Sequence, residues 1–144
     1  RTRLAITRAS SGDRAGALAD LQEALRIDPH SGMAHFAMGE LELERRDAAA
    51  ALAACERATS YQPDFAAAYA CVAKAWAAAG RYEEGIAAFQ RALELDPHLI
   101  QARYALGAAH YMLKEYDAAA EQWLLVLQLK PDHVKARRGL SSLP

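Results

Sequence analysis

Four of the five prolines in this 144-residue chain recur at a constant interval. Pro29, Pro63, Pro97 and Pro131 are spaced 34 residues apart, and the fifth proline is the final residue. A strict period of this size is typical of an array of one small unit that buries its apolar surface against copies of itself. The period therefore argues against a globule organised around a single active site.

Each unit contains two helical patterns joined by a short turn. A proline ends the second pattern, because the residue before proline is kept out of the α region. Turns of only a few residues require neighbouring helices to run antiparallel. We expect first helices over residues 1–11, 32–45, 66–79 and 100–113, and second helices over residues 14–27, 48–61, 82–95 and 116–129.

The fold class predicted from this pattern is all-α, a solenoid of antiparallel helix pairs with 34-residue repeats. The units end at residues 31, 65, 99 and 133 and form a single array over residues 1–144. The first unit is truncated, and residues 134–140 begin a further helix. We therefore expect the natural array to continue in at least one direction.

Aligned on the prolines, the second helices share one packing pattern. Two columns contain mostly alanine or glycine, and the column between them contains larger residues. Small residues let two helices approach closely, and one large side chain fills the space that remains. The outer columns are Ala17, Ala51, Gly85, Ala119 and Ala24, Ala58, Ala92, Val126, and the central column is Leu21, Cys55, Phe89, Trp123.

The composition suits a packed helical core and limits the function. Hydrophobic residues make up 53% of the chain, which argues against a disordered segment. The 17 basic and 18 acidic residues give a net charge of −1, without the strongly basic surface typical of nucleic-acid binding. No apolar run approaches the roughly 18 residues of a membrane-spanning helix. We expect neither nucleic-acid binding nor membrane insertion.

Unit three carries the residues that relate the chain to a known repeat. Its tyrosines, its turn glycine, its small–large spacing and its closing proline together resemble the tetratricopeptide repeat. The resemblance covers essentially the whole chain and implies a right-handed superhelix whose inner wall is built by the first helices. The matching residues are Tyr69, Trp76, Gly80, Tyr82, Phe89, Ala92 and Pro97.

Other units depart from this pattern. Arg8, Glu42 and His110 stand where unit three has Trp76, and Ala48 stands where second helices of the family begin with tyrosine. Unit two therefore lacks two of the bulky residues that fill the space between helices. We expect it to be the most loosely packed unit.

The resemblance also implies which residues face the inner groove. Two apolar zones, one near Phe36 and one near Tyr104, flank an alanine-rich strip beside Lys74. Clustered apolar residues on a concave face favour a binding surface for an extended peptide or an amphipathic helix. The alternative is that the aromatic side chains only cover the groove wall. The implied groove residues are Met33, Phe36, Glu40, Leu43, Ala70, Lys74, Ala77, Gln101, Tyr104, Ala108 and Tyr111.

One ligand type within the family is disfavoured. Repeats that clamp two carboxylates at the end of a peptide use lysine, arginine and asparagine in the groove, and this chain contains no asparagine. We expect Lys74 to pair either with a ligand carboxylate or with Glu40 of the preceding repeat.

No catalytic, metal or cofactor site is expected from the sequence. The five histidines form no i, i+4 pair on a helix face, and no cysteine joins them at ligand spacing. There is no nucleophile motif and no glycine-rich phosphate loop. We therefore expect this chain not to be an enzyme and to bind neither a metal nor a cofactor.

The two cysteines lie almost symmetrically about Pro63. We interpret Cys55 and Cys71 as small buried apolar residues. A disulfide between them is the alternative, which a Cα separation beyond about 7 Å would exclude.

The second helix of unit four is apolar on all sides around Trp123. Leu124 and Leu125 stand where unit three has Gln90 and Arg91. A helix that is apolar all round is usually buried. We expect Leu124 or Leu125 to be covered by residues 134–140, by a further C-terminal segment or by a second copy in a homo-oligomer. These two leucines form a second candidate contact surface.

Together these features predict a protein–protein interaction scaffold that binds an apolar peptide or partner segment in its concave groove. One alternative is a regulatory or substrate-recruiting module of a larger enzyme, or of a secretion or assembly protein. RNA binding is a third hypothesis, but it requires a basic inner surface. The clustered basic residues are confined to Lys135, Arg137 and Arg138.

Overall fold

The computed structural model describes residues 13–144. In that range the chain forms α-helices and no strand. The second helices match the predicted ranges, each first helix ends one residue earlier than predicted, and the helix expected over residues 1–11 lies outside the described residues. The helices are α2 (Arg14–Ile27), α3 (Gly32–Glu44), α4 (Ala48–Tyr61), α5 (Ala66–Ala78), α6 (Tyr82–Leu95), α7 (Ile100–Met112), α8 (Tyr116–Leu129) and α9 (Val134–Ser141).

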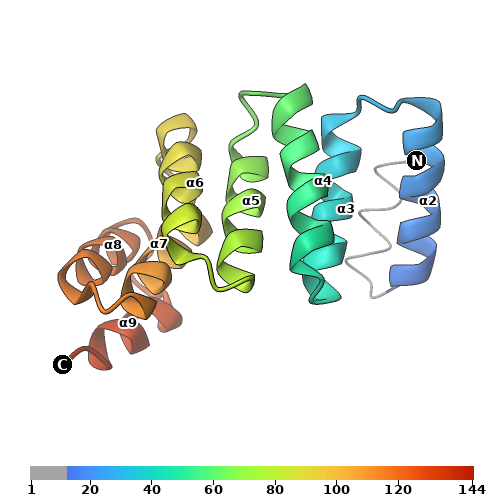
Figure 1. The fold of residues 1–144 in the computed structure, drawn as a ribbon. Helices are drawn as coiled ribbons and strands as arrows, with labels where there is room; N and C mark the ends of the chain where they lie inside the picture. The colour runs from blue at the N-terminus through green and yellow to red at the C-terminus, as the bar shows by residue number, and fades with distance from the viewer. Residues whose placement is uncertain (1–12) are drawn as a thin grey trace.

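The helices stand side by side in a row, with α2 at one end and α9 at the other (Figure 1). From α2 to α9, each helix packs against the next helix in the chain. The architecture is therefore the expected all-α solenoid, in which contacts are local along the sequence.

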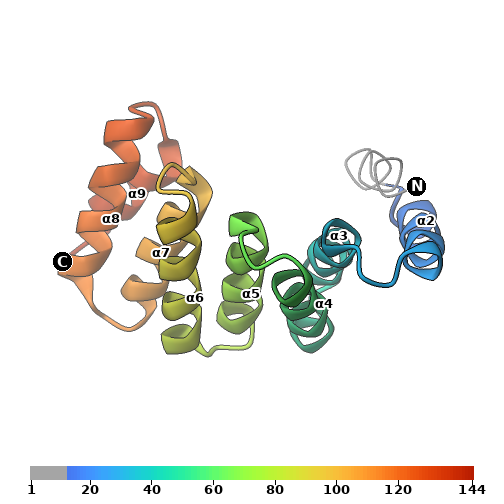
Figure 2. The ribbon, with the colours of Figure 1, turned by 90° about the horizontal axis from the view of Figure 1, so that it is seen from above.

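First helices lie closer to one another than second helices do. α3 contacts α5, and α5 contacts α7, whereas within residues 13–144 no comparable contact joins α4 to α6 or α6 to α8. The view from above shows the same row with the second helices more widely separated (Figure 2). The row therefore curves with the first helices on its inner side.

Within residues 13–144, side chains cap the start of four helices. Asp13, Ser31, Asp47 and His133 each accept a hydrogen bond from the backbone N–H three residues ahead. Such a bond satisfies one of the backbone donors that the first turn of a helix leaves free. The capping residues thus fix where α2, α3, α4 and α9 begin.

The turns after the first helices repeat one backbone conformation. Arg46, Gly80 and Lys114 have φ angles of 61°, 79° and 62°, which lie in the left-handed region. Glycine adopts this conformation freely, whereas arginine and lysine adopt it at a cost of about 1 kcal/mol or more. The turn therefore keeps the same backbone conformation in these three units, even where arginine or lysine disfavours it.

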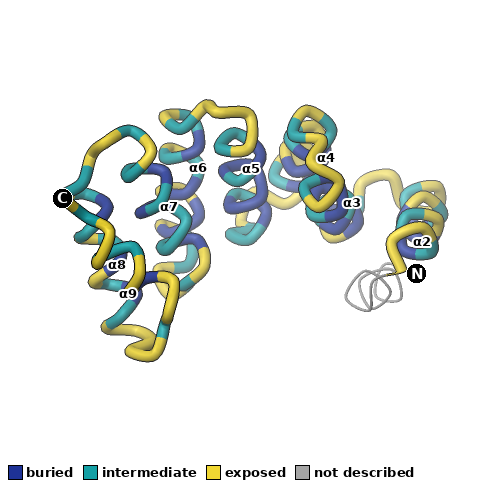
Figure 3. Tube along the Cα trace, turned by 90° about the horizontal axis from the view of Figure 1, so that it is seen from below, coloured by how far each residue is buried: buried dark blue, intermediate teal, exposed yellow. Residues whose placement is uncertain are grey.

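The core follows the columns predicted for the second helices. Leu21, Cys55, Phe89 and Trp123 are at most 3% exposed, and the residues of the two flanking columns are also buried. Buried positions lie where helices face their neighbours, and exposed positions lie at turns and outer faces (Figure 3). Close approach at small residues and filling by one larger side chain explain this core.

Unit two is not loosely packed, which corrects our expectation. A Cβ atom added at Gly39 of α3 would overlap the Cys55 sulfur and lie 3.0 Å from the Cys71 sulfur. The small residues of α4 let α3 approach so closely that large side chains are not needed. Ala51, Ala54, Cys55 and Ala58 of α4 are all buried.

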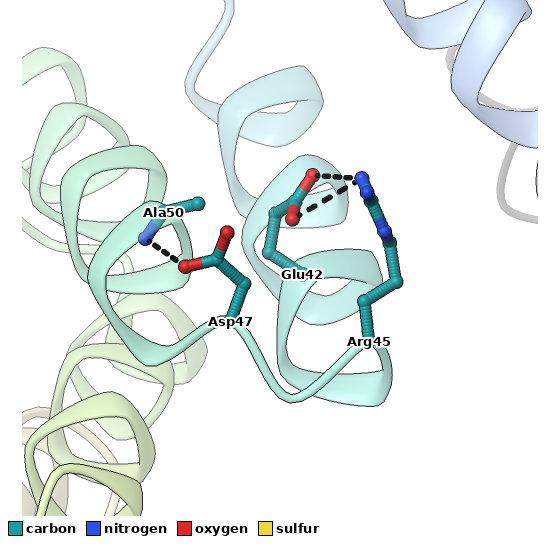
Figure 4. Close-up of polar contacts among 4 residues, drawn as sticks. All are labelled: Glu42, Arg45, Asp47 and Ala50. Atoms are coloured by element: carbon teal, nitrogen blue, oxygen red, sulfur yellow. Dashed lines mark hydrogen bonds and ion pairs between the residues drawn. The ribbon is translucent and has the colours of Figure 1, made fainter.

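In units two and four, the polar residues that stand in place of Trp76 are paired with a charged neighbour. The carboxylate of Glu42, only 8% exposed as a residue, accepts hydrogen bonds of 3.1 and 3.4 Å from Arg45 Nη1 (Figure 4). The same close-up shows Asp47 capping α4 through the N–H of Ala50 at 3.0 Å. In unit four, Nδ1 of His110 lies 3.3 Å from Glu115. Pairing makes a poorly solvated charge tolerable at this position.

Cys55 and Cys71 form a disulfide, which corrects their interpretation as free cysteines. Their Cα atoms are 5.8 Å apart, and both residues are 0% exposed. The bond joins α4 of one unit to α5 of the next. Its sulfur atoms lie in an apolar cluster with Val72, against which Phe36 and Leu43 pack.

Candidate binding groove

The inner side of the row contains a cavity of about 180 Å³ between α3, α5 and α7, which we call the groove cavity. Alanines from α5 and α7 supply the small residues of its lining. Five of the implied groove residues meet there: Phe36, Glu40, Ala70, Lys74 and Gln101. The remaining lining residues are Ala67, Leu99 and Ala102.

Glu40 and Lys74 form an ion pair across two repeats. Lys74 Nζ lies 3.1 Å from Glu40 Oε1, and the two side chains are 41% and 38% exposed, respectively. The internal pairing expected for Lys74 is therefore present. Because these are the two charged residues lining the groove cavity, the rest of its surface is apolar except for the amide of Gln101.

The residues of the first apolar zone lie in different surroundings. Met33 is 44% exposed. The Phe36 ring packs against Phe65 with centroids 4.9 Å apart, and Leu43 is half-buried against the cluster around the disulfide. Ala77 is half-buried on α5, and Met33, Leu43 and Ala77 do not line the groove cavity.

The second apolar zone is largely occupied by contacts within the chain. The rings of Tyr104 and Tyr111 lie 6.2 and 5.9 Å from the Trp123 ring, and Tyr111 also packs edge-on against Tyr116. Trp123 Nε1 donates to the backbone carbonyl of Tyr104 at 3.1 Å. Ala108 packs against the same cluster. At this end of the groove, the alternative in which aromatic residues cover the wall describes these contacts better.

A second and larger cavity of about 520 Å³ lies between the start of α7 and the connection from α8 to α9. We call it the basic cavity. Of the implied groove residues, only Gln101 and Tyr104 line it. Sequence reasoning missed the boundary loop after Pro131 as a source of lining residues, although two lysines flank this loop. The other lining residues are Lys130, Asp132, His133, Val134 and Lys135.

The second candidate contact surface is partly exposed. Leu124 is 53% exposed and Leu125 is half-buried. Helix α9 covers a different side of α8, where Ala136 and Leu140 pack with Trp123 and Val126. The structure thus leaves Leu124 open.

Two further observations on the described part of the chain concern metal ligands and membrane-spanning helices. Residues 13–144 contain no group of three or more histidine, cysteine, aspartate or glutamate residues arranged to hold a metal ion. Within the same range, no helix combines the length and apolar character needed to cross a membrane.

Two sequence profiles match the chain. One, described as a TPR repeat, matches residues 73–114, and the other, described as a tetratricopeptide repeat, matches residues 8–75. No curated protein matches the chain.

Solved structures share the fold. MamA from Desulfovibrio magneticus RS-1 superposes with a TM-score of 0.80 at 27% identity, covering 92% of this chain and 75% of that chain. PilF of Pseudomonas aeruginosa gives 0.91 at 22% identity, covering 99% and 65%, respectively. A chain of the APC/C hetero-tetramer Cut9–Hcn1 gives 0.95 at 17% identity, covering 99% of this chain and 29% of that chain.

Proposed function

Because the chain belongs to the tetratricopeptide repeat family, whose fold is typical of non-catalytic interaction scaffolds, we propose that it binds an apolar segment of a partner protein in its inner groove. In this proposal residues 1–144 act as one array. The first helices recognise the partner, and the second helices set the spacing between them.

One observation carries the proposal: the groove cavity has no uncompensated charge. Its glutamate and its lysine pair with each other, and Phe36, Leu99 and three alanines supply its apolar lining. An apolar side chain is the complementary occupant, because burying it there leaves no charged group without a partner. At about 180 Å³ the groove cavity is smaller than the roughly 300–1,000 Å³ typical of small-molecule sites. This size favours a side chain anchored by a longer peptide.

The proposal is tested with short random peptides displayed on phage and selected on the wild-type protein. Recovered peptides are synthesised and their affinities are measured by fluorescence polarisation. The substitutions Phe36→Ala and Ala67→Arg should each weaken binding by about 5- to 30-fold, as is typical of central interface residues. Circular dichroism verifies that both variants keep their helix content.

Leu124→Ala is the matched control, because it removes an exposed apolar side chain outside the groove. It should leave the affinities unchanged. Peptides that bind the two groove variants as tightly as the wild type would refute the groove as the site. If Leu124→Ala alone weakens binding, the interface lies on α8.

A second role is compatible with the same groove. In the APC/C hetero-tetramer Cut9–Hcn1, the similar fold spans only 29% of a longer chain. If this array likewise belongs to a longer protein, its groove would recruit a partner to a larger enzyme, or to a secretion or assembly protein. A homo-oligomer formed through the C-terminal repeat would instead use Leu124 and is detected by sedimentation.

A further inference from the structure

The groove cavity and the basic cavity are neighbours that share one residue. Gln101, at the start of α7, lines both of them. A peptide lying along the inner side of the array would therefore pass directly from the apolar groove cavity to the basic cavity, which is lined by two lysines.

The lysines of the basic cavity form no ion pair within the described residues. Lys130 and Lys135 have no carboxylate within ion-pair distance in residues 13–144, whereas Lys74 is paired with Glu40 in the groove cavity. Residues 130–138 contain four basic side chains and a single acidic one, in a chain whose net charge is −1. Uncompensated positive charge therefore gathers at this end of the array.

The other polar groups of the basic cavity add hydrogen-bond donors. His133 Nδ1 accepts the backbone N–H of Ala136 at 3.1 Å, so this nitrogen carries no proton and the ring's Nε2–H is a donor. The amide of Gln101 also donates through its nitrogen. Asp132 is the one carboxylate of the lining and offsets one of the two lysine charges. The lining still has a net positive charge and an excess of donors.

A carboxylate is the group that complements this lining, because it is anionic and only accepts hydrogen bonds. We propose that the partner segment held in the groove carries a carboxylate a few residues from its apolar anchor, and that this carboxylate enters the basic cavity. The inference rests on the proposed function and extends it to the partner's chemistry. An acidic side chain and the free C-terminus of a peptide supply the same chemistry.

RNA is the less favoured occupant of the basic cavity. Single strands bind through stacking on open aromatic rings as well as through positive charge. Here the Tyr104 ring already packs against His133 and Trp123, with centroids 5.3 and 6.2 Å away. The one tyrosine ring of the lining is therefore already engaged by two neighbouring rings.

The test compares matched synthetic peptides built on the tightest peptide from the phage selection. Each acidic residue is replaced by its amide isostere, and the C-terminus is free or amidated. Affinities are measured for the wild type, for Lys130→Ala/Lys135→Ala and for the control Arg46→Gly/Arg57→Ala. The control removes two exposed positive charges that line neither cavity, and glycine fits the positive φ at position 46.

The wild type and the control should bind the carboxylate peptide about 3- to 10-fold more tightly than its isostere, as expected for two exposed ion pairs. In the double lysine variant this preference should disappear, and in the wild type it should shrink as salt is added. Loss of the preference on amidating the C-terminus alone identifies the terminal carboxylate, and loss on replacing an acidic residue identifies that side chain.

Peptides that lose affinity in Phe36→Ala but show no carboxylate preference would overturn this inference while leaving the groove intact. Peptides indifferent to Phe36 would refute the proposed function itself. Fluorescent oligouridine that binds the wild type but not the lysine variant, with no carboxylate preference, would overturn the inference in favour of RNA.

Discussion

Reduction of the Cys55–Cys71 disulfide should destabilise the helix pairs on either side of it. The bond closes a loop with a sequence separation of 16, and both cysteines are 0% exposed. Opening a loop of this length restores conformational entropy to the unfolded chain. The chain-entropy relation gives about 3 kcal/mol at 25 °C for it.

The assay is urea unfolding followed by circular dichroism, with and without prior reduction. Oxidised protein is unfolded in the presence of an alkylating agent, and mass spectrometry should detect no modified cysteine. Reduced protein should carry two modifications and unfold at a lower urea concentration, with a free energy of unfolding lower by about 3 kcal/mol. Because repeat arrays unfold as coupled neighbours, the loss should be largest in α4 and α5, which hydrogen exchange resolves.

A Cys55→Ala/Cys71→Ala variant is the control, and its unfolding should not respond to reductant. Two alkylated cysteines in protein that was never reduced would show that the bond does not form. An unchanged urea midpoint after verified reduction would refute the entropy reasoning, because opening the bond would then not have raised the conformational entropy of the unfolded chain as the relation requires.

Three further outcomes follow from single contacts, each read as a change in the free energy of unfolding in urea. A double-mutant cycle on Glu40 and Lys74 should give a coupling of only about 0.5 kcal/mol that fades with salt, since both side chains are more than one third exposed; coupling above roughly 2 kcal/mol would contradict this. Gly107→Ala should destabilise the array by about 1–3 kcal/mol, because the new Cβ would lie 2.7 Å from Trp123 Cδ1; an unchanged midpoint would mean that the indole moves aside freely. Lys114→Gly should stabilise it by about 0.5–1 kcal/mol, because its φ of 62° is unfavourable for lysine; destabilisation would indicate that the lysine side chain makes an essential contact.

The helices were predictable because the proline period, the small columns and the turn positions impose the same register. A proline shortly after the last residue ends α4 and α6, and the repeat places this same signal several times in one chain. The buried columns of the second helices, with Leu21 first in the central column, were predictable for the same reason. Contacts in a solenoid join elements that are neighbours in sequence.

The misjudged features depend on distances that a column alignment does not contain. Whether Cys55 and Cys71 bond depends on how closely α4 approaches α5. Gly39 of α3 leaves the space that the two sulfur atoms occupy. Unit two was expected to be loose because Glu42 and Ala48 stand where other units have bulky residues. Small residues nevertheless pack tightly when the backbones approach.

The lining of the groove cavity was predicted in part. Column positions placed Phe36 and Lys74 on one surface, because first helices of consecutive units repeat the same face. They did not indicate that Tyr104 would pack against Trp123, a contact that depends on the rotamer of a large ring. The boundary loop near His133 was missed because the columns followed helices, whereas the basic cavity is lined partly by a connection.

The disulfide also has a mechanical consequence. A pulling force applied to the two ends of the chain passes from Cys55 to Cys71 through the sulfur atoms, so the 16 residue steps between them carry no load while the bond is intact. At about 3.4 Å per residue, this segment withholds about 50 Å of contour length from the stretched chain. The oxidised protein is thus shorter at full extension than the reduced one, and the junction between α4 and α5 is a point where tension bypasses the backbone.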